Sequence, residues 1–373
     1  MGKARNIADL LNSSGKIDSA DIDSSAQFYQ FKNRIINGAM MIDQRNAGAS
    51  VTANNSGVYG VDRFLTEAYG GGSLSSQRST TAPAGFINSL LLTVTGTDTS
   101  LSTSDDYEFN QKIEGFNCSD LGFGTANAST ITMSFWVRSS VIGTYSVGFQ
   151  NSSASRSYVA TYTINAANTW EQKTITVAGD TGGSGSWETG NSTGLFIRWC
   201  LATGTNRIAS AANTWESANR IAISSTANPI MGTSGATFYI TGVQLEKGST
   251  ATSFDYRPYG TELALCQRYA IKYLGSGAYE KVPAVGMCLS STQFTASIGV
   301  PVAMRASPSL SYSNIVLGTT SSAISVTSVV VDHTSTLAPS FNFNVSSGLT
   351  TGQPAFLQAN ATTSAFVILS AEL

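Results

Sequence analysis

The chain has 373 residues, of which 42% are hydrophobic and only 12% charged, with a formal net charge of −2. That length allows two or three domains. Lys and Arg form no basic cluster, which argues against a nucleic-acid partner. No apolar run reaches the ~18 residues of a membrane span, so we expect no membrane insertion. Ser, Thr, Gly and Asn fill the polar positions instead, a composition typical of β-rich proteins.

A short amphipathic helix is expected at the start of the chain. Ile7, Leu10 and Leu11 follow helical spacing, and Gly15 ends the pattern before the polar stretch "IDSADIDSS". A helix of this size is not stable alone. We therefore interpret residues 1–27 as a helical anchor for docking or oligomerisation, the alternative being a helix that packs on its own domain. The segment lacks the continuous apolar core of a secretory signal.

Alternating strands dominate residues 28–258. In "STITMSFWVRSS" the side chains of Ile131, Met133, Phe135 and Val137 share one face, and "GLFIRWCLATG" alternates in the same way. Short strands separated by Gly, Ser and Asn clusters predict an antiparallel β-sandwich rather than βαβ units. The segment "AANTW" occurs at 166–170 and 211–215, and we interpret both copies as similar turns that enter a strand.

A second β-domain is expected in residues 259–373. The stretch "TELALCQRY" predicts a short helical connector. It is followed by strand-like runs such as "FTASIGVPVAM", "ISVTSVVVD" and "AFVILSAEL". The predicted fold class is therefore all-β, with a large sandwich, a smaller C-terminal β-domain and the N-terminal anchor. Cys118, Cys200, Cys266 and Cys288 form no CxxC pair and are expected to be reduced and buried.

Several stretches resemble bacteriophage tail-fibre and virion structural proteins. "NRIINGAMMIDQRNAG" followed by "YGVDRF" is similar to the opening of many such proteins. "ITMSFWVRSS", "TWEQKTITVAGDT" and "FYITGVQLEKGSTATSFDYRP" are similar to their jelly-roll module, which itself resembles carbohydrate-binding modules. "ELALCQRYAIKY" followed by "VPVAMRASPSL" resembles the junction into their C-terminal domain. These motifs occur in the expected order over roughly residues 30–310.

The resemblance implies a virion appendage protein, assembled in the host cytoplasm as a homotrimer, that attaches to a host-surface glycan without enzymatic activity. The N-terminal segment would contact other tail or adaptor proteins, and the domain at 259–373 would be the host-recognition tip. Two alternatives stay open: an appendage-bound polysaccharide hydrolase, and a capsid or tail decoration protein without receptor binding.

Catalytic residues are hard to assemble from this sequence. The chain has one histidine, His333, and the match of "GNSTG" to a nucleophile elbow falls in a Gly/Ser loop rather than a strand-to-helix turn. Asp105, Asp106 and Glu108, with Glu114 nearby, are the tightest acidic group, and we interpret them as solvated carboxylates of a polar connection. No cofactor is expected. A structural calcium ion is compatible with a jelly roll, but no ligands can be assigned.

Sugar binding needs aromatic faces for stacking and polar side chains for the hydroxyl groups. Trp136 and Arg138 lie on the face of their strand opposite the aliphatic side chains, and we expect them beside Phe196 and Arg198. Trp187 stands in the polar loop "GDTGGSGSWETG". These five residues are the candidate glycan site. The structural alternatives are that Trp136 packs on a neighbouring subunit and that Trp187 folds back onto its sheet.

Overall fold

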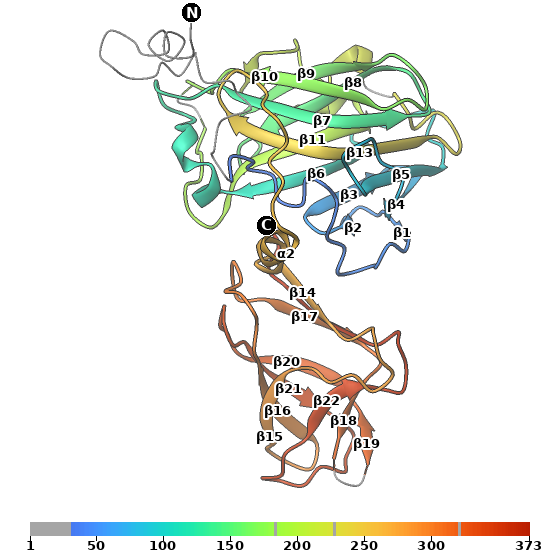
Figure 1. The fold of residues 1–373 in the computed structure, drawn as a ribbon, viewed down its shortest axis with the longest axis vertical. Coiled ribbons are helices and arrows are strands. Elements are labelled where there is room, and N and C mark those ends of the chain that lie inside the picture. Colours follow the sequence, from blue (N-terminus) through green and yellow to red (C-terminus); the bar gives the residue numbers. More distant parts are fainter. Residues whose placement is uncertain (1–30, 183–184, 227–228, 320–321) are drawn as a thin grey trace, which may run out of the picture.

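The computed structural model describes residues 31–182, 185–226, 229–319 and 322–373, so the expected anchor with Ile7, Leu10 and Leu11 lies outside the described residues. The described chain forms a large sandwich and a smaller β-rich body, joined by helix α2 (Tyr259–Gln267) (Figure 1). The expected all-β class is confirmed, and no described helix is long and apolar enough to cross a bilayer.

Two antiparallel sheets form the sandwich. The first sheet has six strands in the order β1 (Val51–Thr52), β4 (Ser73–Ser79), β5 (Ser89–Gly96), β13 (Thr237–Lys247), β7 (Ile131–Ser139) and β10 (Glu171–Val177). The second has seven, in the order β12 (Trp215–Glu216), β9 (Ser157–Ile164), β8 (Gly143–Gln150), β11 (Thr193–Thr203), β6 (Asp106–Glu114), β3 (Phe64–Tyr69) and β2 (Val58–Val61). Single 3-10 turns lie at Gly115–Asn117, Ser119–Leu121, Thr205–Arg207 and Ser224–Thr226.

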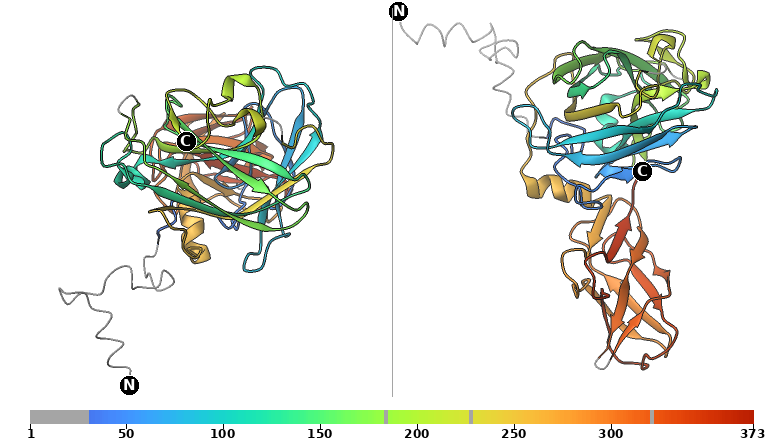
Figure 2. Two further views of the ribbon diagram at one scale, coloured as in Figure 1. Left: turned by 90° about the horizontal axis from the view of Figure 1, so that it is seen from above. Right: turned by 90° about the vertical axis from the view of Figure 1, so that its right-hand side faces the viewer.

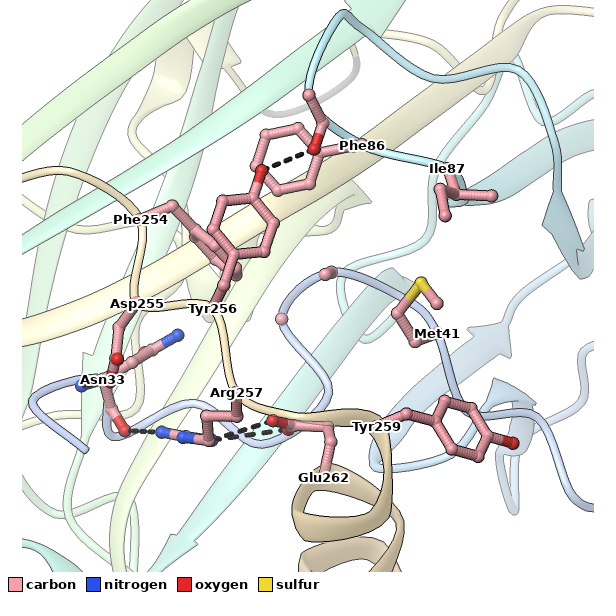
Figure 3. A pocket seen from close by; sticks show the side chains of 13 residues that line it. Asn33, Met41, Phe86, Ile87, Phe254, Asp255, Tyr256, Arg257, Tyr259 and Glu262 are labelled. Atoms are coloured by element: carbon pink, nitrogen blue, oxygen red, sulfur yellow. Dashed lines mark hydrogen bonds and ion pairs between the residues drawn. The ribbon is translucent and has the colours of Figure 1, made fainter. Parts of the chain in front are cut away.

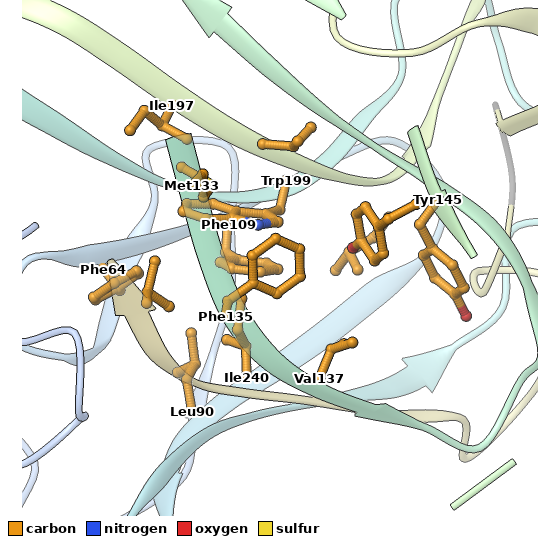
Figure 4. Packing of buried hydrophobic residues seen from close by; sticks show 14 of the residues in the cluster. Phe64, Leu90, Phe109, Met133, Phe135, Val137, Tyr145, Ile197, Trp199 and Ile240 are labelled. Carbon is orange, nitrogen blue, oxygen red and sulfur yellow. The ribbon is translucent and has the colours of Figure 1, made fainter. Parts of the chain in front are cut away.

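The core lies between the two sheets, where the inward positions of both meet (Figure 4). Trp199 of β11 stacks on Phe109 of β6 at a centroid distance of 5.0 Å, and Phe135 of β7 meets the same indole edge-on. The expected inward positions of β7 and β11 are confirmed, because Met133, Phe135, Val137, Ile197 and Trp199 are all fully buried. Burial of large aromatic rings contributes most of the apolar area that holds such a sandwich together.

The smaller body contains three short antiparallel sheets. Their strand orders are β14 (Ala270–Tyr273), β23 (Phe366–Ser370) and β17 (Ser309–Ser313); β15 (Ala284–Cys288), β16 (Gln293–Ile298), β21 (Ser340–Asn344) and β20 (Ser328–His333); and β19 (Ala323–Ser325), β18 (Ile315–Gly318) and β22 (Phe356–Ala359). A separate hydrophobic cluster, which includes Phe294, Phe341 and Phe343, fills the space between them. This body therefore has its own core and extends away from the sandwich (Figures 1 and 2).

The joint between the two bodies is fixed by charged groups from both sides. The Glu114 carboxylate at the end of β6 accepts hydrogen bonds from Arg268 Nε at 2.9 Å and from the Tyr269 hydroxyl at 2.8 Å. At the far end of the chain, Glu372 pairs with Arg45 at 2.9 Å and with Arg63. The chain thus crosses the joint once through α2 and returns to it with its last residues.

The two "AANTW" segments adopt the same loop, as expected. In the first copy the Glu171 carboxylate accepts hydrogen bonds from the backbone N–H groups of Asn165 and Ala166. In the second, Glu216 accepts the equivalent bonds from the N–H groups of Ser210 and Ala211. Asn168 and Asn213 both have positive φ, a conformation that Asn tolerates better than most residues. All four cysteines are also buried and free, as expected.

Candidate functional site

A polar groove lies on the outer face of the seven-stranded sheet. Two adjoining hollows, of about 360 and 620 Å³, share Asn55, Tyr69 and Ser104. Their other lining side chains include Asn54, Glu67, Ser102, Asp105, Asp106, Arg198 and Arg207. We call this surface the sheet groove. Both volumes fall within the range of small-molecule sites in proteins.

Strand geometry places these side chains on one surface. Glu67 and Tyr69 of β3 pair with Glu108 and Asp106 of β6, and all four point away from the core because Thr66, Phe109 and Trp199 occupy the alternate positions. The turn after β3 needs glycine at Gly70, where a side chain would collide with the Tyr107 hydroxyl. That hydroxyl accepts a hydrogen bond from Gly72 N–H and donates one to Asp98 Oδ2, each at 2.7 Å. Tyr69 stands beside this turn with half of its surface exposed.

A buried charge network forms the floor of the groove. Arg198 donates from Nε to Glu108 Oε2 at 2.6 Å and from Nη2 to Asp106 Oδ2 at 2.8 Å. Glu67 and Glu108 face each other across the strand pair, and Asn110 Nδ2 donates to both, at 2.7 and 3.0 Å. Burial raises the pKa of Glu108 well above its ordinary value, although the positive charge of Arg198 opposes the shift. Burial likewise raises the pKa of Asp106.

One oxygen of this network has no partner among the residues that the structure describes. Asp106 is 8% exposed, and its Oδ1 atom is buried without a hydrogen bond, although its Oδ2 accepts one from Arg198. A buried acceptor left unpaired carries a desolvation cost. Asp106 therefore has an unpaired acceptor beneath the surface of the groove, and its carboxyl group lies beside that of Glu67.

The predicted acidic group is thus located differently from what we expected. Asp105, Asp106 and Glu108 are not solvated turn carboxylates, because Asp106 begins strand β6, Glu108 lies within it, and all three are buried. The alternation of Tyr107, Phe109 and Ile113 with polar residues was the sequence signal for this strand. The same signal, in "FLTEAYGGG", could have indicated the groove residues Glu67 and Tyr69, which sequence reasoning missed along with Asn54, Asn55 and Arg207.

The expected grouping of Trp136 and Arg138 with Phe196 and Arg198 is wrong. Strand β7 belongs to the six-stranded sheet and β11 to the seven-stranded sheet, so the outward side chains of the two strands lie on opposite sides of the sandwich. Phe196 and Arg198 do lie together, with the guanidinium 5.1 Å from the ring centroid. Arg138 instead lies over Tyr239 and donates to the carbonyl of Asn168.

Trp187 folds back onto the sandwich. Its ring meets Phe123 edge-on at 4.9 Å and Trp215 at 5.6 Å, and its indole N–H donates to Asp180 Oδ2 at 3.2 Å. The structural alternative that we considered for this loop is therefore the arrangement observed. The indole borders a small hollow with Leu121 and Leu195.

A more apolar pocket lies where the sandwich meets α2 (Figure 3). Phe86, Phe254 and Tyr256 cluster there with centroid distances of 4.8 to 5.6 Å. Its charged groups are already paired, since Arg257 contacts Glu262 at 3.3 Å and Asp255 accepts a hydrogen bond from the Asn33 N–H. The charged groups of this pocket therefore serve to hold the segment that precedes α2, which contains Asp255 and Arg257.

Within the described ranges, no group of three or more His, Cys, Asp or Glu side chains is placed to hold a metal ion. His333, the one histidine, is exposed on β20 and pairs with its neighbour Asp332.

No protein-family model and no curated protein matches the sequence. Solved structures with some similarity include the enzymatically active domain of tailspike protein 4 from bacteriophage CBA120, with 11% identity and a TM-score of 0.29 over 58% of this chain and 22% of that chain. A family 11 carbohydrate-binding module of Clostridium thermocellum has 12% identity and a TM-score of 0.29 over 55% of this chain and 99% of the module. The module TmCBM61 in complex with β-1,4-galactotriose has 8% identity and a TM-score of 0.28, covering 58% and 99%. This chain thus spans about a fifth of the tailspike domain and nearly all of the two modules.

Proposed function

We propose that this protein is a non-enzymatic appendage of a phage virion that attaches to a host-surface glycan through the sheet groove. The observation that carries the proposal is the groove itself, in which half-exposed Tyr69 stands among amide, hydroxyl and carboxylate groups. An aromatic face beside convergent polar groups is the arrangement that stacks a pyranose ring and pairs its hydroxyl groups. The motif order along the sequence supports the virion assignment.

Tyr69→Ala tests the groove. Tyr69 is 50% exposed, so its removal should leave the fold intact and weaken binding of host polysaccharide about fivefold per site, the loss of one stacking contact. Tyr279→Ala is the matched control, since Tyr279 is 68% exposed on the other body. Both proteins would be titrated with polysaccharide from susceptible cells and added as competitors of phage adsorption. Equal binding by the two variants would show that the groove is not the receptor site.

Polysaccharide hydrolysis is the second candidate, because the groove brings carboxylates of Glu67 and Asp106 to one wall. The same polysaccharide should yield no new reducing ends during incubation with the protein. If the unchanged protein releases reducing ends and the Glu67→Gln variant does not, the hydrolase is favoured instead.

Homotrimeric assembly is the second part of the proposal. The edge strands of the four-stranded sheet, β15 and β20, expose Val285 at 84%, Met287 at 51% and Val330 at 55%. Exposed apolar edges favour pairing with another chain, and a second copy would cover them. We expect sedimentation equilibrium at micromolar concentration to give three times the chain mass, and Val285→Lys with Val330→Lys to lower it. A monomer at that concentration would contradict the proposal.

A further inference from the structure

The sheet groove has more acidic than basic groups. Four carboxylates lie in or directly beneath it, those of Glu67, Asp105, Asp106 and Glu108, against the two guanidinium groups of Arg198 and Arg207. Burial raises the pKa of both Glu108 and Asp106, and protonation of either one would still leave three carboxylates facing the two cations. The groove therefore has an excess of negative charge.

The basic groups of this face are largely engaged. Arg198 is 6% exposed, and beyond its two carboxylate partners it donates from Nη1 to Asn219 Oδ1 at 3.2 Å and to Gln150 Oε1 at 3.4 Å. Arg207 stands at the rim with its Nε 3.5 Å from Asp106 Oδ2. Lys112, further along β6, donates to the carbonyl of Leu373. An anionic ligand would therefore have to compete with carboxylates for Arg198 and Arg207, and with the Leu373 carbonyl for Lys112.

The carboxylates, in contrast, can accept further hydrogen bonds. Among the residues that the structure describes, Glu67 accepts a side-chain hydrogen bond only from Asn110, through Oε2, and Asp106 Oδ1, which is buried, has no partner. Carboxylates accept several hydrogen bonds each and donate none when ionised. The hydroxyl groups of a saccharide are suitable donors, whereas a second carboxylate would add repulsion and an unpaired charge.

On the basis of the proposed function, we infer that the sheet groove selects uncharged saccharides and discriminates against acidic ones such as uronic or sialic acids. Tyr69 supplies the stacking face, Glu67 supplies the acceptor, and Asp106 adds its carboxyl group beside Glu67. The discrimination resides in the carboxylates, so it can be changed without removing the stacking contact.

The test uses the full chain on an array of bacterial lipopolysaccharides and capsular polysaccharides, both neutral and acidic. We expect signals from uncharged polymers that persist in high salt and weaken in Tyr69→Ala. Glu67→Gln keeps the oxygen that accepts from Asn110 and removes one charge, so signals from acidic polymers should rise by up to about fivefold in this variant. Asp332→Asn, on the smaller body, is the control and should change neither set.

Each other outcome is decisive. Tyr69-dependent signals mainly from acidic polymers would overturn the inference and leave the proposed function standing. Binding to amino-sugar polymers that high salt abolishes would also overturn it, by showing simple charge attraction. An array without any Tyr69-dependent signal would overturn the proposed function itself.

Discussion

Arg198 shows how a residue that looks like a ligand contact can serve the fold instead. Its guanidinium holds Glu108, which is fully buried, and Asp106. We expect Arg198→Ala to lower the free energy of unfolding of the sandwich by about 3–5 kcal/mol, because it leaves buried carboxylates without a counter-charge. Arg207→Ala, at a side chain with 32% of its surface exposed, should cost less than about 1 kcal/mol. Urea titration of both variants measures the difference, and equal losses would refute this role for Arg198.

Sequence reasoning at the residue scale succeeded where the alternation was apolar and failed where it was polar. The inward positions of β7 and β11 could be predicted because Met133, Phe135, Ile197 and Trp199 repeat every second residue. The outward residues of β6 could not be recognised as buried, because burial of Asp106 and Glu108 depends on Arg198, which lies 92 and 90 positions away. A partner that distant leaves no local signal in the sequence.

The positions of helices and strands along the chain were easier to predict than the order in which the strands pair in the sheets. The repeated "AANTW" loops and the helical connector at α2 depend on local hydrogen bonds, which a short stretch of sequence specifies. Strand pairing is not local: β13 joins β5 to β7, whereas β11 joins β6 to β8. Nothing in the strands themselves told us that Trp136 and Phe196 belong to different sheets.

The joint formed by β6 and the end of α2 should respond to acid. Burial alone would raise the pKa of Glu114, but the hydrogen bonds from Arg268 and Tyr269 outweigh it and hold the pKa below the ordinary 4.5. A depressed pKa stabilises the folded state above the unfolded value, and this contribution is lost as the pH falls through the folded value. We therefore expect the joint to weaken below about pH 4.5.

Thermal unfolding of Glu114→Gln beside the unchanged protein, from pH 7 to pH 2, measures this contribution. The variant should be less stable at pH 7 and approach the unchanged protein at the acid end, where both lack the charge. A constant difference at every pH would show that the Glu114 charge does not hold the joint.

At the scale of the whole molecule, two bodies with separate cores meet at a joint built from residues far apart in the sequence. Cys266 and Tyr269 pack with Ile36 and Ile42 there, and Glu372 pairs with Arg45 across 327 positions. The end of the helical connector takes part in this joint, because Arg268 and Tyr269 both bind Glu114 of the sandwich. Contacts from both ends of the smaller body therefore hold it against the sandwich.

If the protein attaches to a host as we propose, the two bodies can divide recognition between them. The groove residues all precede residue 258, whereas the smaller body ends in exposed loops at the far end of the molecule (Figure 1). Loops of that kind vary without disturbing a core.

A chimera that takes residues 270–373 from a relative with another host, but keeps Glu372 for Arg45 and Arg63, preserves the joint. We expect its glycan-array profile to follow the sandwich and the cells that it labels to follow the exchanged body, because weak groove contacts add to those of the tip. If the labelled cells also follow the sandwich, the smaller body is a spacer, and if the glycan profile follows the exchanged body, the groove is not the glycan site.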